Sequence, residues 1–250
     1  MFKNKAELPK IAIIGYGQMG KEINILAREN NFEVTDIFDL DNVLNDTKDY
    51  EFDVAIDFSF PKSAIKNALI LSSLGKNIVM GTTGWYDDAE TMKKIISENN
   101  NGFVWGSNFS VGVQLFFRII ENAAKIIDKF DNFDLMLHEM HHRRKKDSPS
   151  GTAETLADII LQNVARKTSL ETNAINGEVD EAKLHVSSTR GGEITGRHTL
   201  YIDSISDSIE LSHRAKNRKG FAMGSLVAAK WIHNKKGYFQ YNQVIDDILL

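Results

Sequence analysis

Short apolar runs alternate with longer stretches of helical spacing through the first 110 residues. The runs expected to form strands cover residues 10–14, 32–38, 53–58, 77–80 and 102–105. Between them, apolar residues recur at helical spacing over residues 21–30, 63–74 and 87–98. Brief apolar runs are typical of parallel strands that are buried on both faces. Their alternation with helices predicts βαβ units and a Rossmann-type, doubly wound parallel sheet in an α/β fold.

The pattern changes after Ser110. A long helix, a strand and a second helix are expected, and three strand-type segments follow, over residues 113–130, 133–140, 153–165, 182–189, 195–202 and 207–213. This order predicts a separate α+β domain. An apolar helix over residues 221–234 is expected to pack back on the first domain. The predicted domains are therefore residues 1–110 with 216–250, and residues 111–215. The aromatic residues Phe116, Phe117 and Phe130 and the three tryptophans are expected in the cores.

Composition narrows the class of protein. The chain has 250 residues, of which 42% are hydrophobic, so it can build one large core or two modest ones. Its formal net charge of -4 argues against a protein that chiefly binds phosphate backbones. With no cysteine, disulfides, thiolate metal sites and cysteine nucleophiles are excluded. Residues 1–10 are polar, and no long apolar run is present, so a soluble, cytoplasmic protein with no membrane partner is expected.

A glycine-rich loop follows the first predicted strand. Gly15-Tyr16-Gly17-Gln18-Met19-Gly20 fits the dinucleotide-binding pattern, with a strand before it and a helix after it. In this pattern the first glycine allows a tight turn, the second lets the backbone approach a pyrophosphate, and the third allows close helix–strand packing. We therefore expect all six residues to bind a nicotinamide cofactor. A plain turn is the simpler alternative for the glycines alone.

Asp39 ends the second predicted strand, 19 residues after Gly20. An acid at this point accepts hydrogen bonds from the 2′-hydroxyl of a ribose and repels a 2′-phosphate. The following residues, Leu40-Asp41-Asn42, include no arginine to offset that repulsion. NADH is therefore the expected preference, with NADPH as the alternative cofactor.

Two further small-residue loops follow the fourth and fifth predicted strands. They are Gly81-Thr82-Thr83-Gly84 and Gly106-Ser107-Asn108-Phe109. Open α/β sheets bind ligands along the edge where their strands end. We expect Gly81, Thr82, Thr83, Gly106, Ser107, Asn108 and Phe109 to contact the cofactor, although tight strand-to-helix turns would also explain these residues.

The densest positive charge lies just before the second helix of the second domain. It is the run His141-His142-Arg143-Arg144-Lys145-Lys146. On its own, such a run also fits a solvated loop or a nucleic-acid-binding patch. Ser150, Gly151 and Thr152 follow, with Ser150 as a candidate N-cap and free backbone N–H groups at the helix start. Cations and a helix N-terminus together predict a site for an anion, with proton donors beside it.

This stretch closely resembles the signature of the dihydrodipicolinate (4-hydroxy-tetrahydrodipicolinate) reductase family. Every fixed position of the family pattern is matched in Glu139-x-His-His-x-x-Lys-x-Asp-x-Pro-Ser-Gly-Thr-Ala153. Gly81–Gly84, Asn108–Gly112, Arg190–Thr199 and the segment from His213 through Gly224 continue the resemblance across nearly the whole chain. One departure is Gln18, where many members have arginine, so pyrophosphate binding is expected to rest on backbone N–H groups.

The resemblance implies an oxidoreductase that uses NAD(P)H to reduce 4-hydroxy-tetrahydrodipicolinate to tetrahydrodipicolinate, in the diaminopimelate route to lysine. Hydride transfer to the ring is followed by protonation. By motif position, His141 and Lys145 are the expected proton donors, and His142, Gly151 and Thr152 the expected substrate binders. Glu139 and Asp147 are expected to orient the cations. No metal is implied, and the second domain is expected to bind substrate and to assemble a homotetramer.

The sequence also fits several alternative roles and functions. Arg190, His213 and Arg218 fit solvated charges at strand ends as well as a role in the site. Another nicotinamide enzyme, such as an aspartate or diaminopimelate dehydrogenase, would require or release ammonia. A sensor would bind NADH without consuming it. A nucleic-acid binder using residues 141–146 would bind with strongly salt-dependent affinity.

Overall fold

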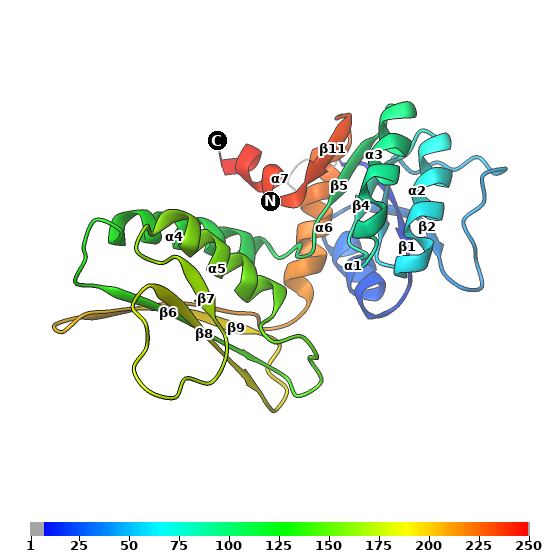
Figure 1. Cartoon of the computed structure of the whole chain (residues 1–250). Coiled ribbons are helices and arrows are strands. Elements are labelled where there is room, and N and C mark those ends of the chain that lie inside the picture. The colour runs from blue at the N-terminus through cyan, green and yellow to red at the C-terminus, as the bar shows by residue number, and fades with distance from the viewer. Residues whose placement is uncertain (1–7, 250) are drawn as a thin grey trace. The chain divides into compact units, whose positions relative to one another are not determined.

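The chain divides into two compact units (Figure 1), described by a computed structural model over residues 8–249. The borders lie between Val111 and Gly112 and between Asn217 and Arg218, one and two residues from the expected positions. Residues 1–7, on which most of the expectation about an absent leader rests, lie outside the described residues. No helix within residues 8–249 has the length and apolar character needed to cross a bilayer.

The first unit is built on a parallel sheet of six strands. They are β1 (Lys10–Ile14), β2 (Glu33–Phe38), β3 (Val54–Asp57), β4 (Asn77–Met80), β5 (Gly102–Trp105) and β11 (Gly237–Gln240). Their order is β11-β5-β4-β3-β1-β2, and every neighbouring pair is parallel. Every residue of β3 and β4 is buried, as expected for strands covered on both faces. The prediction of a doubly wound sheet is confirmed, with β11 as an additional strand.

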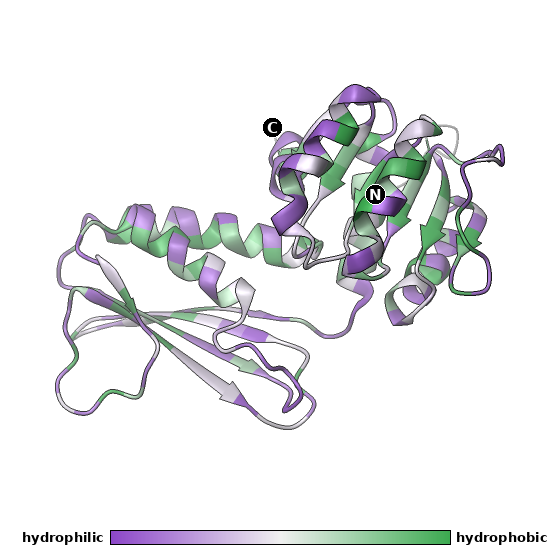
Figure 2. Cartoon of the chain, turned by 45° about the vertical axis from the view of Figure 1, so that its right-hand side comes forward, coloured by the Kyte–Doolittle hydropathy of each residue, from purple (hydrophilic) through white to green (hydrophobic). Residues whose placement is uncertain are grey.

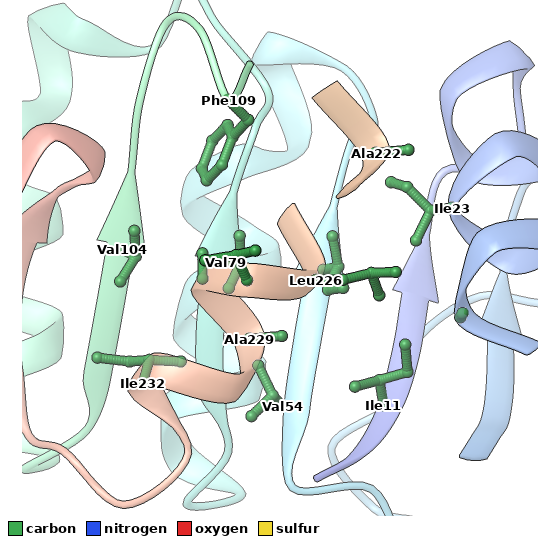
Figure 3. Close-up of a cluster of buried hydrophobic side chains, with 14 of the residues drawn as sticks. Ile11, Ile23, Val54, Val79, Val104, Phe109, Ala222, Leu226, Ala229 and Ile232 are labelled. Carbon is green, nitrogen blue, oxygen red and sulfur yellow. The ribbon is translucent and has the colours of Figure 1, made fainter. Parts of the chain in front are cut away.

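Helices cover both faces of this sheet. On one face lie α1 (Gln18–Glu29), α6 (Lys219–Ile232) and α7 (Tyr241–Leu249), and on the other lie α2 (Ala64–Ser73) and α3 (Ala89–Glu98). Successive residues of β1 serve the two cores in turn, because side chains alternate along a strand: Ile11 and Ile13 pack toward α1 and α6, Ala12 and Ile14 toward α2. Figure 3 shows Leu226, Ala229 and Ile232 of α6 in one cluster with Ile11 and Ile23, so the predicted return of this helix to the first unit is confirmed.

The second unit has a mixed sheet of five strands. They are β6 (Asp134–His141), β7 (Ser169–Glu171), β8 (Lys183–Arg190), β9 (Arg197–Asp203) and β10 (Ser208–Arg214), in the order β10-β9-β6-β8-β7. The neighbours β6, β8 and β7 run parallel, whereas β9 is antiparallel to both β6 and β10. Helices α4 (Val111–Ile127) and α5 (Gly151–Asn163) lie over one face of this sheet (Figure 1). The predicted α+β unit is confirmed.

The covered face of this sheet is apolar at one end and polar at the other. Pairs of residues under the helices form the core: Leu135 and Leu137, Leu184 and Val186, Leu200 and Ile202. Figure 2 shows that apolar and polar residues also alternate along α4, which covers this face of the sheet. Phe116 and Phe117 join this core, but Phe130 lies beyond the end of α4 with 51% of its surface exposed, so its predicted burial is wrong. Of the three tryptophans, Trp85 is buried, and Trp105 and Trp231 are partly exposed.

Candidate active site

The predicted cofactor residues lie at one edge of the parallel sheet. The glycine loop follows β1, Asp39 follows β2, Gly81-Thr82-Thr83 follows β4, and Gly106 to Phe109 follows β5. Because all these strands are parallel, their carboxyl ends meet at the same edge. The chain order reverses between β1 and β3, and such a switch point is where open α/β sheets form their ligand crevice.

The three glycines of the loop have the geometry that a dinucleotide requires. Gly15 has φ +88°, and a Cβ there would lie 2.4 Å from the carbonyl oxygen of Phe58. A Cβ on Gly20 would lie 2.1 Å from the carbonyl oxygen of Gly15, so this glycine permits the close approach of α1 to the loop. Gly17 is the N-cap of α1 and has open space around its Cβ position. A pyrophosphate can therefore approach the backbone at the helix N-terminus.

Asp39 is held in a tight turn after β2. Its Oδ1 atom accepts hydrogen bonds from the backbone N–H groups of Asp41 and Asn42, each at 2.9 Å. The side chain of Asn42 donates to the carbonyl oxygen of Ile37 at 2.7 Å, which closes the turn further. The carboxylate is therefore fixed at the sheet edge on an exposed residue, where its Oδ2 atom can accept hydrogen bonds from a ribose.

Two of the predicted cofactor residues have buried side chains. Thr82 is 5% exposed, and its hydroxyl donates to the carboxylate of Asp57 at 2.8 Å. Phe109 is 2% exposed, and its ring centroid lies 4.5 Å from that of Tyr241. These two side chains therefore pack inside the first unit, beneath the edge of the sheet.

A buried carboxylate, Glu139, is the centre of a polar cluster in the second unit. Its Oε1 atom accepts hydrogen bonds from the backbone N–H of Ser150 at 3.0 Å, the hydroxyl of Ser188 at 2.9 Å and the guanidinium of Arg190 at 2.7 Å. Its Oε2 atom lies 3.0 Å from Nδ1 of His141 and 3.6 Å from Nε2 of His198. The Glu139 side chain, which is 1% exposed, thus links its own strand β6 to β8, to β9 and to the start of α5.

Strand register explains this cluster. Glu139 lies opposite His198 of β9 and Ser188 of β8, and His141 lies opposite Arg190. Alternation puts these residues on the same face as the core pairs under α4 and α5. The cluster is therefore the polar continuation of the hydrophobic core.

The charges within the cluster are set by burial and by hydrogen bonds. Burial alone would raise the pKa of Glu139, but the nearby imidazoles of His141 and His198 and the hydrogen bonds from Ser150 and Arg190 together outweigh it and hold the pKa well below its ordinary value. Burial lowers the pKa of His198, against the opposing effect of Glu139. The cluster therefore contains an ionised Glu139 and favours a neutral His198.

The start of α5 lies directly beside Glu139. Ser150 is the N-cap, as predicted, and its Oγ atom accepts from the backbone N–H of Ala153 at 3.3 Å. Gly151 and Thr152 are the first two helical residues, whose N–H groups point out of a helix N-terminus. The Oγ atom of Ser150 is also 3.2 Å from Nε2 of His198. The structure thus brings the predicted anion-binding helix start together with the histidine cluster.

The basic run itself divides into two groups. His142 is anchored through its backbone N–H to the carbonyl oxygen of Ile194 at 2.7 Å, and Lys145 pairs with Asp147 at 2.9 Å while its side chain is 24% exposed. Arg144 instead forms a two-pronged ion pair with Glu193, and Arg143 is 75% exposed. Arg143 and Arg144 are therefore engaged at the surface with Glu193, which leaves His142 and Lys145 as candidate site residues.

Sequence reasoning gave no role to Ser188 and His198. His198 lies within the Arg190–Thr199 segment that carries the family resemblance, whereas Ser188 is signalled only by the alternation of β8. The sequence did not decide between a solvated charge and a site role for Arg190. In the structure Arg190 donates to both Glu139 and the carbonyl oxygen of Asp147. His213 lies opposite His198 in the β9–β10 register, and Arg218 is exposed.

Glu139, His141 and His198 also have ligand atoms within 4.8 Å of one another, the spacing of a possible metal site. However, Arg190 lies 2.7 Å from the same carboxylate, and its positive charge opposes that of an added cation. The arrangement suits a hydrogen-bonded network better than a metal centre.

Comparison with known proteins agrees with this geometry. Residues 9–109 match the family model described as the N-terminus of dihydrodipicolinate reductase, and residues 112–245 match that of its C-terminus. The 4-hydroxy-tetrahydrodipicolinate reductase of Christiangramia forsetii is 37% identical over 238 residues, which cover 95% of this chain and 98% of the relative. The same-named protein of Methanocaldococcus jannaschii is 37% identical over 79% of this chain and 71% of its own.

A solved structure has the same fold. It is the dipicolinate-bound dihydrodipicolinate reductase from Paenisporosarcina sp. TG-14, with a TM-score of 0.73 and 20% identity, covering 94% of this chain and 99% of that protein. The resemblance inferred from the Glu139–Ala153 signature is confirmed by the family models. The chain belongs to the dihydrodipicolinate reductase family and has the fold of an oxidoreductase that uses a nicotinamide cofactor.

Proposed function

We propose that this protein reduces 4-hydroxy-tetrahydrodipicolinate to tetrahydrodipicolinate, in the diaminopimelate route to lysine. The observation that carries the proposal is the pairing of His141 and Arg190 with Glu139, which also accepts from the N-cap residue Ser150 of α5. Lys145 pairs with Asp147, three residues before Ser150. A cyclic dicarboxylate needs positive charge and oriented N–H donors, and this arrangement supplies both. The named activity of the relatives and the dipicolinate bound to the structural neighbour support the same substrate class.

In the proposed reaction, the 4-hydroxyl leaves as water, and a hydride and a proton add to the ring. A nicotinamide cofactor held at the edge of the parallel sheet would supply the hydride. Gly151 and Thr152 hold a substrate carboxylate at the start of α5, assisted by His142. Lys145 and His141 supply the proton at the carbon next to the one that receives the hydride.

In this scheme, Glu139 orients the imidazole of His141. Its Oε2 atom lies beside Nδ1 of His141, which directs the proton of that nitrogen toward the carboxylate. The other ring nitrogen, Nε2, faces Gly196, where a Cβ would approach to 3.0 Å. Glu139 thereby fixes the orientation of the imidazole, and Asp147 holds Lys145 in the same way.

NADH is the proposed preference over NADPH. The fixed carboxylate of Asp39 suits a free ribose 2′-hydroxyl, and the neighbouring Asp41 adds negative charge that opposes a 2′-phosphate. A comparison of kcat/KM for the two cofactors tests this preference directly, and a strong preference for NADPH would contradict it.

A homotetramer built through the mixed sheet is the proposed assembly. Helices α4 and α5 cover only one face of that sheet (Figure 1), and the other face presents the partly buried side chains of Met136, Met140 and Tyr201. Light scattering on the purified protein would give its mass. The cytoplasm is the proposed compartment of this enzyme.

The first experiment follows NADH absorbance at saturating cofactor, with the substrate made freshly by a synthase from pyruvate and aspartate semialdehyde. Rapid oxidation that requires every component is expected. Oxidation that requires ammonia instead would indicate an amino-acid dehydrogenase. NADH binding without oxidation would favour a sensor. A separate titration with nucleic acid tests the remaining alternative, and salt-dependent affinity there would favour a binding role for residues 141–146.

A further inference from the structure

A second buried carboxylate lies at the cofactor edge of the first unit. Asp57 is the last residue of β3 and is 0% exposed. β3 neighbours β1 at the point where the chain order of the sheet reverses. Asp57 therefore lies directly beneath the crevice in which a sheet of this kind binds its ligand.

Every hydrogen bond that the Asp57 carboxylate accepts comes from a neutral group. Its Oδ1 atom accepts from the backbone N–H of Ser59 at 2.9 Å, the hydroxyl of Ser59 at 2.6 Å and the hydroxyl of Thr82 at 2.8 Å. Its Oδ2 atom accepts from the side-chain amide of Asn67 at 2.8 Å. Burying a polar group is costly unless it is hydrogen-bonded, and these four bonds offset the cost for Asp57.

The four bonds tie together three separate segments. Ser59 belongs to the turn after β3, Thr82 to the loop after β4, and Asn67 to α2. The backbone N–H of Ser59 also donates to the Thr82 hydroxyl at 2.8 Å, which joins the two loops directly. The carboxylate thus fixes the relative positions of two loops at the edge.

Phe58 extends this control to the glycine loop. It stands between Asp57 and Ser59, and its carbonyl oxygen lies where a Cβ on Gly15 would approach to 2.4 Å. Its ring fills the space beside Gly81, where a Cβ would come within 2.2 Å of the ring. A shift of Phe58 would therefore move the loops after both β1 and β4.

We propose that Asp57 is a positioning residue for the nicotinamide cofactor, because it holds the loops after β1, β3 and β4 in the arrangement that binds the dinucleotide. This inference rests on the cofactor use within the proposed function. A carboxylate suits the position because both of its oxygens can accept hydrogen bonds and all its partners are donors. An asparagine there would keep one acceptor oxygen and turn an N–H group toward Asn67.

The test measures NADH affinity by titration calorimetry, without substrate, for the full-length protein and its variants. Asp57→Asn is expected to weaken NADH binding about three- to tenfold, because one oxygen can still serve Ser59 and Thr82. Asp57→Ala is expected to weaken it by more than about tenfold, since four donors lose their acceptor. In turnover, KM for NADH is expected to rise more than kcat falls.

Asn77→Ala is the matched control. Asn77 is 2% exposed and begins β4, at the opposite edge of the sheet, where its amide bonds to the carbonyl oxygens of Ile232 and His233. This variant is expected to lower thermal stability while NADH affinity stays within twofold of the wild type. A general loss of stability would weaken binding in both variants alike, so equal losses in Asp57→Asn and Asn77→Ala would overturn the proposal.

Other outcomes are equally distinct. If Asp57→Asn folds and binds NADH as tightly as the wild type, the inference is wrong although the proposed function stands. Where Asp57→Ala does not fold, Asp57→Asn alone decides. If the wild type binds neither NADH nor NADPH, the proposed function fails first.

Discussion

The two sheets of this protein present their chemistry in different ways. The parallel sheet is covered on both faces, and its predicted cofactor residues lie in loops beyond the strand ends. The mixed sheet is covered by helices on one face, and Glu139, Ser188 and His198 belong to its strands. A buried sheet uses backbone groups at its edge, whereas a half-covered sheet can place polar side chains where its core ends.

This difference predicts how each site responds to substitution. At the glycine loop, contact with a ligand depends on backbone N–H groups and on the absence of side chains. In the Glu139 cluster, the proposed function depends on particular side chains with particular partners. Single substitutions should therefore have larger and more specific effects in the second unit.

The largest effect is expected for the proposed proton donors. His141→Ala and Lys145→Ala should each lower kcat by about 10²- to 10⁴-fold, the usual contribution of a positioned general acid. NADH affinity, measured by calorimetry, should change little, because neither residue belongs to the unit that carries the glycine loop. Lys146→Ala, at an exposed position of the same run, serves as control and should retain wild-type turnover. Near-normal kcat in both donor variants would refute these roles.

A large loss of stability is expected for Glu139→Ala. The substitution leaves Arg190 without its buried carboxylate and removes the acceptor of the Ser150 N–H. Breaking a buried ion pair in this way costs about 3–5 kcal/mol. Urea unfolding should show this loss, and Ser188→Ala, which removes a single neutral donor, should cost only about 1 kcal/mol. A loss for Glu139→Ala as small as that for Ser188→Ala would mean that the carboxylate does not hold the cluster together.

Most of the architecture could be predicted from the sequence because short apolar runs and helical spacing are local signals. The strands that escaped prediction are the shortest edge strands: β7 has three residues, and β11 is the four-residue Gly237–Gln240. Their positions are determined by pairing with β8 and β5, which is tertiary information. A burial pattern that helical spacing suggests, as at Phe130, also fails where the helix ends early.

Residues of the candidate site were also predictable where they are close in sequence, and not where tertiary structure brings them together. The basic run and the start of α5 are contiguous, so the sequence presented them together. Ser188 contacts Glu139 from 49 residues away, and only strand register brings the two together. Asp57 was hidden for a similar reason, because an acid at the end of an apolar strand has no motif, and its partners lie in two other segments.

A moderate effect is expected at Asp39, the proposed cofactor residue of the first unit whose side chain is charged. Asp39→Ala should raise KM for NADH about tenfold, the cost of losing a hydrogen bond to a charged acceptor, and should narrow the preference over NADPH. Asp41→Ala, which removes a neighbouring charge while keeping the backbone N–H that bonds to Asp39, should raise it much less. Initial rates with both cofactors measure these changes. An unaltered NADH:NADPH ratio for Asp39→Ala would contradict the assigned role.

The smallest effect concerns pH and belongs to the second unit. Burial lowers the pKa of both His198 and His213 below the ordinary value of 6.5, and the unfolded chain therefore binds protons more readily at these positions. Their contribution to stability is fully present above pH 6.5 and is lost as the pH falls through the lowered values. Urea unfolding between pH 7.5 and 5 should thus show a declining free energy of unfolding. His213→Phe keeps a ring beside Phe116, whose centroid lies 5.8 Å from that of His213, and removes one titrating group. Its decline should be shallower than that of the wild type, and an equally steep decline would show that His213 does not contribute.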